Sequence, residues 1–264
     1  MNRRAFARWG VPLAVLAAAA AAHAQSAPPE AAAQGETSRQ SYANPSAAIA
    51  AEMEFARMAQ EKGQWTAFRA MAAEDAAMFA PGAGQGMVLA RDWLKNRANP
   101  ASGLRWEPHQ VWSSCDGSLM VTHGAWRKGQ SQGWFTTVWR RERDGRYRWT
   151  FDHGDSAAAP IAAPDMIVSR IADCPPRRVG ARPAAPDTRR GRPGKPAKPP
   201  AAPKVVIPFD PMAREGRSND GTLTWRVSID RAGTRDFVVR LKSEGEMREI
   251  VSEHVAAGAA QGGS

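Results

Sequence analysis

Residues 133–153 read GWFTTVWRRERDGRYRWTFDH, and this stretch decides the predicted fold. Two runs rich in aromatic and β-branched residues flank Asp144-Gly145, and Asp-Gly between such runs is a strong signal for a β-hairpin. We therefore predict that residues 133–142 pair with residues 147–153. Seven of the ten tryptophans lie between Trp93 and Trp149, which indicates a sheet with a large aromatic core.

The residues before this hairpin predict a second hairpin, a short strand and three helices. The second hairpin is formed by residues 104–113 and 119–127, which flank the turn sequence Cys115-Asp116-Gly117. Apolar side chains at helical or strand spacing place helices at residues 46–63, 65–72 and 88–97 and the short strand at residues 76–80. Helices followed by a meandering antiparallel sheet predict an α+β fold rather than a parallel βαβ fold.

The chain after position 174 is expected to form a linker and a small β-rich unit. Residues 175–204 contain nine prolines, nine lysines or arginines and one acidic residue, so we expect a disordered, extended spacer. In residues 205–264, apolar and polar side chains alternate at 223–229 and 237–241, with a possible third strand at 246–251. Three strands are marginal alone, so this β-meander should dock on the first domain or on a partner subunit.

The position of the positive charge limits the possible partners. The net charge is +10, but most of it lies in the linker and in the leader, and the remaining residues are close to neutral. The linker either acts as a tether or contacts anionic envelope phosphates or nucleic acid. Because no aromatic side chains interrupt the basic residues to stack on bases, we expect no specific nucleic-acid site.

Residues 1–24 have the pattern of a secretory signal peptide. A cationic start is followed by an apolar run of residues 11–22 and by a small-x-small cleavage sequence, Ala22-His23-Ala24. The alternative is a membrane anchor, but the run is shorter than a spanning helix requires. We therefore expect a flexible mature N-terminus at residues 25–45, a first domain at residues 46–174, no membrane span after cleavage, and a periplasmic or secreted protein.

Export changes the interpretation of the two cysteines. In an oxidising compartment, Cys115 and Cys174 are expected to form a disulfide, and the alternative is a pair of buried free thiols. Two cysteines exclude a disulfide-dense scaffold and a four-cysteine zinc site.

The order of elements over residues 46–155 resembles the nuclear transport factor 2-like superfamily, in its SnoaL-like and kinase-association-domain-like branch, as an exported bacterial member. The resemblance rests on Phe55-Ala56, on GQWTAF at 63–68, on AEDA at 73–76 and on the hairpin at 133–149. It implies a curved antiparallel sheet around the helices, enclosing a conical pocket, and often a dimer. Members include isomerases, dehydratases, cyclases, hydrolases and binding proteins, so function must be argued from the pocket.

Ketosteroid isomerases give the sharpest enzymatic comparison within that resemblance. Their catalytic carboxylate corresponds to Ala80, their hydrogen-bonding tyrosine to about Ala56, and their acidic donor to about Thr137. None of the three roles is retained, so we reject that mechanism for this chain.

The weak catalytic candidates are His123, His153 and Asp152, and His109 and Asp155 are the other residues of suitable type. Adjacent residues on a strand face opposite ways, so Asp152 and His153 should not touch directly, and all of these residues are more simply polar sheet residues. Apolarity favours Trp134, Val138, Trp149 and Phe151 inside the cone, together with His153. The resemblance instead favours Thr137 and Trp139, together with Asp152. The candidate binding residues are Trp112, Thr137, Trp139 and Trp149.

Three functions remain open on the sequence alone. The first is an exported binding or accessory protein that holds a small apolar or amphipathic molecule in its cone. The second is a SnoaL-like enzyme of the cyclase, isomerase or hydrolase type that uses a His/Asp pair. The third is a structural module that forms a homodimer. No metal or cofactor is expected, because glycine-rich GAGQG at 82–86 lacks nucleotide-binding spacing and adjacent strand residues diverge.

Overall fold

The structure is a computed structural model, and it describes residues 43–80, 86–175 and 208–258. The predicted signal peptide, nearly all of the predicted flexible N-terminus and nearly all of the predicted linker lie outside these residues. The expected domain boundaries therefore stay predictions.

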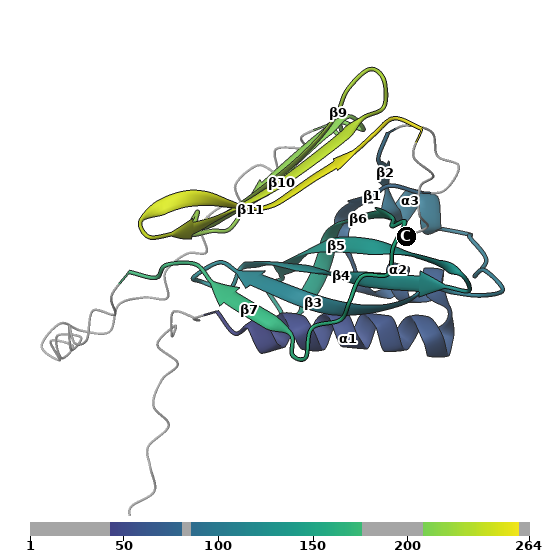
Figure 1. Cartoon of the computed structure of the whole chain (residues 1–264), viewed down its shortest axis with the longest axis horizontal. Coiled ribbons are helices and arrows are strands. Elements are labelled where there is room, and N and C mark those ends of the chain that lie inside the picture. Colours follow the sequence, from purple (N-terminus) through teal and green to yellow (C-terminus); the bar gives the residue numbers. More distant parts are fainter. Residues whose placement is uncertain (1–42, 81–85, 176–207, 259–264) are drawn as a thin grey trace, which may run out of the picture. The chain divides into compact units, whose positions relative to one another are not determined.

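The larger sheet has seven strands and carries the helices. The elements in chain order are α1 (Pro45–Lys62), α2 (Gln64–Met71), β1 (Ala72–Met78), β2 (Val88–Leu89), α3 (Ala90–Leu94), β3 (Arg105–Ser113), β4 (Leu119–Lys128), β5 (Ser131–Arg141), β6 (Tyr147–Ser156) and β7 (Val168–Ile171). The strand order is β2-β1-β6-β5-β4-β3-β7. Helix α1 runs along one face of the central strands (Figure 1). Both predicted hairpins are present, with Gly117 and Gly145 at positive φ in their turns.

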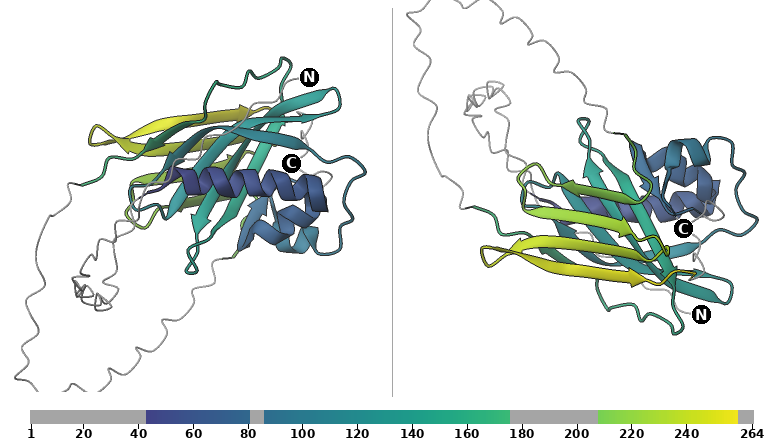
Figure 2. Two further views of the ribbon diagram at one scale, coloured as in Figure 1. Left: turned by 90° about the horizontal axis from the view of Figure 1, so that it is seen from below. Right: turned by 90° about the horizontal axis from the view of Figure 1, so that it is seen from above.

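The second sheet is antiparallel and has four strands, which Figure 2 shows side by side. They are β8 (Ala213–Arg217), β9 (Leu223–Ile229), β10 (Arg235–Ser243) and β11 (Glu246–Val255), in the order β11-β10-β9-β8. Strand β8 was not predicted, because its sequence AREGR has no alternating apolar pattern.

The predicted fold class is wrong. The described chain is mostly β, and its large sheet is mixed rather than antiparallel, because β1 pairs with β6 and β7 pairs with β3 in parallel. The chain after the linker forms a sheet of four strands rather than the expected small three-stranded meander, and its apolar side chains share a core with the large sheet. Both parallel pairings join segments far apart in sequence, and an alternation pattern carries no information about such pairings.

The end of α1 shows how single residues set the helical layer. Gly63 adopts φ 96°, a value that favours glycine, and a Cβ there would lie 2.2 Å from the Asn99 side chain. Asn99 uses this space: its Nδ2 donates to Lys62 O at 3.3 Å and its Oδ1 accepts from the Thr66 N–H at 3.1 Å. The turn between α1 and α2 is thereby fixed on both sides.

The large sheet buries apolar side chains on both faces. On the helix side, Phe55 and Phe68 pack against Trp139 and Trp149, with ring centroids 5.9 Å apart for Phe55–Trp139 and 5.6 Å for Phe68–Trp149. On the other face, Phe151 stacks on Trp225 at 5.1 Å and on Phe237 at 5.3 Å. Because burying each large side chain contributes roughly 1.5–3 kcal/mol, both layers contribute substantially to stability.

The predicted disulfide between Cys115 and Cys174 is confirmed. It lies beside the second sheet, since the Cys115 N–H donates to Thr222 Oγ1 at 2.9 Å and the Asp173 N–H donates to Lys242 O at 2.9 Å. A disulfide agrees with an oxidising compartment. Among the described residues, no helix is long and apolar enough to cross a membrane.

Candidate functional site

A β-bulge in β6 decides which side chains face the helices. Trp139 lies opposite Trp149 and Val138 opposite Phe151, so Thr150 is the extra residue. The helix face consequently receives Thr137, Trp139, Trp149 and Asp152, whereas Val138, Phe151 and His153 face the second sheet. The resemblance correctly predicted that Thr137, Trp139 and Asp152 face the helices. Of the four aromatic and aliphatic residues favoured by apolarity, only Trp149 does so.

The interior of the expected cone is nearly filled. A hollow of about 20 Å³ remains, lined by Phe55, Phe68, Leu104, Trp106, Trp126, Phe135, Asp152, His153 and Gly154. That space holds about one water molecule, whereas sites for drug-sized ligands usually measure roughly 300–1,000 Å³. A larger ligand therefore requires side chains at the hollow to move.

Glu52 is a buried carboxylate on the apolar face of α1. Its oxygens accept hydrogen bonds from Trp106 Nε1 at 2.7 Å, Thr122 Oγ1 at 2.5 Å and Trp139 Nε1 at 2.9 Å. Burial raises the pKa of Glu52, although the three donors oppose that effect. Glu52 was not predicted as a site residue. Its position between Ala48, Phe55 and Ala59 on one helical face was the available signal.

Asp152 is a second buried carboxyl group on the helix face of the sheet, and it lines the hollow. Thr137 Oγ1 donates to Asp152 Oδ2 at 2.7 Å. Burial raises the pKa of Asp152 to about 8, and the nearby charge of Glu52 adds to the rise. At neutral pH, Asp152 is therefore largely protonated and can act as a hydrogen-bond donor.

Trp126 also lines the hollow. Its indole N–H is buried and has no hydrogen-bond partner in the described part of the chain. A buried polar group without a partner is unfavourable, and a bound water or a ligand atom would satisfy it. The Trp126 ring packs directly over Gly133. A Cβ at position 133 would lie 2.5 Å from two carbons of the ring, so a larger residue there would displace it.

The imidazoles of the two histidine candidates contact Glu253 of β11 on the opposite face of the sheet, although His153 also borders the hollow. Thr136 Oγ1 donates to Glu253 Oε1 at 2.6 Å, and His123 Nδ1 lies 2.9 Å from Thr136 Oγ1. His123 Nδ1 also lies 3.2 Å from Glu253 Oε1. Since the Thr136 proton goes to Glu253, the His123 Nδ1–H is the donor toward both Thr136 Oγ1 and Glu253 Oε1. His153 Nε2 lies 2.7 Å from Glu253 Oε2 in an ion-pair contact that is not aligned for a hydrogen bond.

Glu253 is held ionised by these neighbours. Burial raises its pKa, but the charge of His153 and the hydrogen bond from His123 outweigh burial and lower the pKa to about 2. The structure thus brings His123 and His153 together through a residue that was not predicted. It does not join Asp152 to His153, whose side chains contact different partners on opposite faces.

The remaining sequence candidates are not at the hollow. Trp112 packs in the core between the two sheets, and Nε2 of the buried His109 lies 3.8 Å from Glu107 Oε1. Among the described residues, no group of three or more His, Cys, Asp or Glu is arranged to hold a metal ion.

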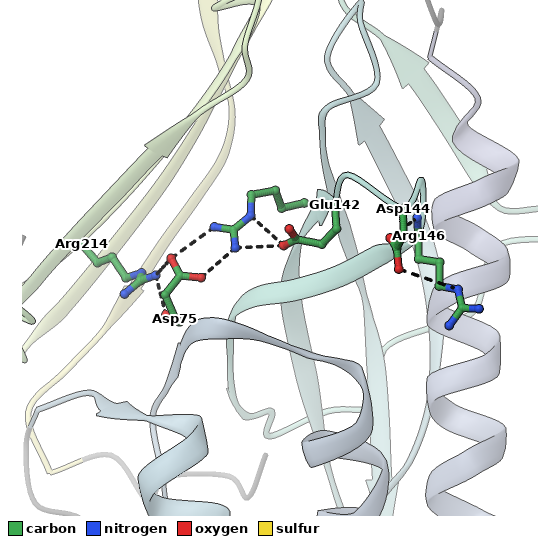
Figure 3. Close-up of polar contacts among 6 residues, drawn as sticks. Asp75, Glu142, Asp144, Arg146 and Arg214 are labelled. Carbon is green, nitrogen blue, oxygen red and sulfur yellow. Dashed lines mark hydrogen bonds and ion pairs between the residues drawn. The ribbon is translucent and has the colours of Figure 1, made fainter. Parts of the chain in front are cut away.

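A larger groove of about 1570 Å³ lies beside β1 and β8. Within it, Asp75 pairs with Arg140 at 2.8 Å and with Arg214 at 3.0 Å, and Glu142 pairs with Arg140 (Figure 3). Burial raises the pKa of Asp75, but the two arginines outweigh it and leave the pKa below its usual value. These opposite charges neutralise one another, so this network gives the groove no preference for an anion or a cation.

Comparisons with known proteins give weak likenesses. No family model matches the chain, and no curated protein matches it. Among solved structures, a "putative ketosteroid isomerase" from Parabacteroides distasonis ATCC 8503 is similar, with a TM-score of 0.35 and 17% identity over 46% of this chain and 98% of that one. An LEH-like epoxide hydrolase from M. tuberculosis is similar, with a TM-score of 0.31 and 21% identity over 43% of this chain and 81% of that one. With identities this low and both TM-scores below 0.5, these likenesses establish neither the superfamily nor the branch of the chain.

Proposed function

We propose that the protein binds a small amphipathic molecule through an acceptor oxygen placed at Asp152 and Trp126. The observation that carries this proposal is the buried carboxyl group of Asp152, whose pKa burial raises to about 8, in a hollow otherwise lined mainly by apolar and aromatic side chains. A carbonyl or ether oxygen would accept from Asp152 and from the unpartnered Trp126 N–H, while the apolar part contacts the aromatic rings.

The ligand enters by separating a small set of side chains. Leu104, Trp126 and Phe135 form a buried cluster of their own, apart from the two main cores, and Trp106 is only partly buried beside it. A satellite cluster of this size can open at a lower free energy than the main core. The 20 Å³ hollow is then the closed form of the site.

Cyclohexanone, with methylcyclohexane as the apolar control, tests this proposal through tryptophan fluorescence. We expect saturable binding of the ketone that weakens by about tenfold or more from about pH 6 to about pH 10, because ionised Asp152 cannot donate. In Asp152→Asn the amide still donates at both pH values, so binding should lose this pH dependence.

Trp126→Phe is the companion variant, and Trp112→Phe on the other face of the sheet is its matched control. Loss of the indole N–H should weaken ketone binding by about tenfold, whereas Trp112→Phe should leave it unchanged. Equal binding of ketone and hydrocarbon, or equal effects of the two variants, would contradict the proposed site.

A proton-transferring enzyme is the second candidate, and the paired carboxyl groups favour it. Glu52 and Asp152 both have raised pKa values, and the charge of Glu52 acts on Asp152. A carboxyl group with a pKa near the working pH is suited to general acid–base catalysis. Deuterium exchange at the α-carbons of cyclohexanone, measured by NMR, should then be faster with the wild type than with Asp152→Asn. Binding without exchange would leave only the binding function.

We also propose that the protein acts outside the cytoplasm. The disulfide supports this location, since such bonds persist in oxidising compartments. Osmotic-shock fractionation of the source cells should release the protein with the periplasmic fraction or the medium. Recovery with cytoplasmic proteins, with both thiols reduced, would contradict the proposal.

A further inference from the structure

The turn between β3 and β4 recurs, atom for atom, between β8 and β9. In the first turn, the Ser114 N–H donates to Leu119 O at 3.0 Å, and Ser114 Oγ donates to Asp116 Oδ1 at 2.7 Å. In the second turn, the Ser218 N–H donates to Leu223 O at 2.9 Å, and Ser218 Oγ donates to Asp220 Oδ1 at 2.6 Å. The following glycines, Gly117 and Gly221, have φ values of 64° and 71°.

The equivalence extends through the strands on both sides. In the large sheet, the register between β5 and β6 shifts at Val138/Trp139; in the small sheet, the register between β10 and β11 shifts at Val239/Arg240. The turn that follows each of these strands contains a glycine at nearly the same φ, 81° at Gly145 and 83° at Gly245. Strands β8–β11 therefore repeat β3–β6 in strand order, turns and bulge position.

The contacts between the two sheets are reciprocal. The Asp116 N–H donates to Asp220 Oδ2 at 2.8 Å, and the Asp220 N–H donates to Asp116 Oδ2 at 3.2 Å. The Cys115 N–H donates to Thr222 Oγ1 at 2.9 Å, and its equivalent, the Asn219 N–H, donates to Ser118 Oγ at 2.9 Å. In a twofold, self-complementary interface, each contact between the two halves occurs twice, with the roles of the two halves exchanged. The two pairs of hydrogen bonds above follow this pattern.

The far end of the interface obeys the same relation. His153 and Glu253 occupy equivalent positions beyond the two bulges, and they contact each other at 2.7 Å. Thr136 hydrogen-bonds Glu253, and Phe237, which is equivalent to Thr136, packs on His153 with ring centroids 4.6 Å apart. The pseudo-twofold relation thus holds from the Asp116/Asp220 turns to the His153/Glu253 pair.

We propose that β8–β11 is an internal duplicate of β3–β6 that takes, within one chain, the place of the sheet of a second subunit. The face of the large sheet opposite the helices is then a self-association surface, and the partner that covers it is the chain's own C-terminal sheet. The protein is accordingly a monomer, and this proposal replaces the homodimer expected from the sequence.

The outer face of the duplicate explains why it needs no helices of its own. The positions equivalent to Thr122, Thr137 and Trp139 are Arg226, Val238 and Arg240, which line an open hollow of about 620 Å³ together with other charged and polar residues. In the large sheet the corresponding face is apolar and covered by α1 and α2. The duplicate has therefore retained the apolar inner face that packs against the large sheet. On its outer face, residues that tolerate water stand where the large sheet has residues buried under the helices.

The mass of the full chain tests the identity of the partner. Light scattering should give the mass of one chain for the wild type. Leu223→Asp combined with Phe237→Asp should detach the C-terminal sheet and expose the apolar face, so that two chains pair and the mass doubles. Arg226→Asp on the outer face is the matched control and should stay monomeric. A dimeric wild type, or a folded double variant that remains a monomer, would overturn the proposal.

Amide hydrogen exchange tests the symmetry even where the double variant fails to fold. Asp116→Asn keeps one oxygen for its own turn but removes the acceptor for the Asp220 N–H, whose exchange should accelerate by about tenfold or more. Asp220→Asn should accelerate the Asp116 N–H by a similar factor. Asp230→Asn changes a carboxylate that accepts from the Ala232 and Thr234 N–H groups of another turn, and it should alter neither amide. An effect in one direction only would overturn the twofold relation.

Discussion

Asp152→Asn should make the protein more stable than the wild type at pH 8, by on the order of 5 kcal/mol, while the two differ little near pH 3.5. The ordinary pKa of an aspartate carboxyl group is 3.8, which the unfolded chain should show, whereas that of Asp152 in the folded protein is about 8. Between these values the unfolded chain releases a proton that the folded chain keeps, so wild-type stability falls as pH rises. Asparagine has no such proton and can still accept the Thr137 hydrogen bond.

Urea unfolding at several pH values measures this difference. The exposed Asp165→Asn is the matched control, and its stability should follow that of the wild type at every pH. Parallel stability curves for the wild type and Asp152→Asn would show that Asp152 is ionised in the folded protein and would remove the proposed hydrogen-bond donor.

Replacement of both cysteines by serine should lower the free energy of unfolding by about 4 kcal/mol. Cys115 and Cys174 are 59 residues apart, and their bond closes a long loop in the unfolded chain. The loss should also loosen the junction between the sheets, since Cys115 and Asp173 both contact the second sheet.

Thermal unfolding with and without reductant checks this prediction. Reduced wild type should match the double serine variant, and reductant should not change the variant. Unchanged stability on reduction would mean that the bond constrains neither the unfolded chain nor the junction.

Most local elements of the first domain were predictable from sequence, but strands β2 and β7 were not predicted and neither were the long-range pairings. Asp-Gly turns and apolar alternation located both hairpins, and Gly63 correctly marked the end of α1. The parallel partners of β1 and β7 could not be predicted, because neither strand carries a turn signal that joins it to its neighbour. The fold class failed for this reason.

The site was predicted only in part because a single bulge changed the facing of β6. Strict alternation cannot place Trp149 and Asp152 on one face, and the bulge at Thr150 does so. Glu52 and Glu253 were missed because their partners are distant in sequence. For Glu253, His123 and His153 on the large sheet become neighbours only when the two sheets pack together.

The internal duplication had a visible sequence signal that was not used. Ser114, Asp116, Gly117 and Leu119 have counterparts of the same type and spacing in Ser218, Asp220, Gly221 and Leu223. The match is short and the strands between the turns have diverged, so only the shared register and bulge reveal its extent.

The most direct test of the account is the titration of the Asp152 carboxyl carbon by NMR, with Asp152→Asn used to assign the signal. We predict a pKa near 8 that rises further when cyclohexanone is present, because the ketone binds the protonated form. Titration near the usual value for aspartate, or a pKa that the ketone leaves unchanged, would contradict the proposed binding site.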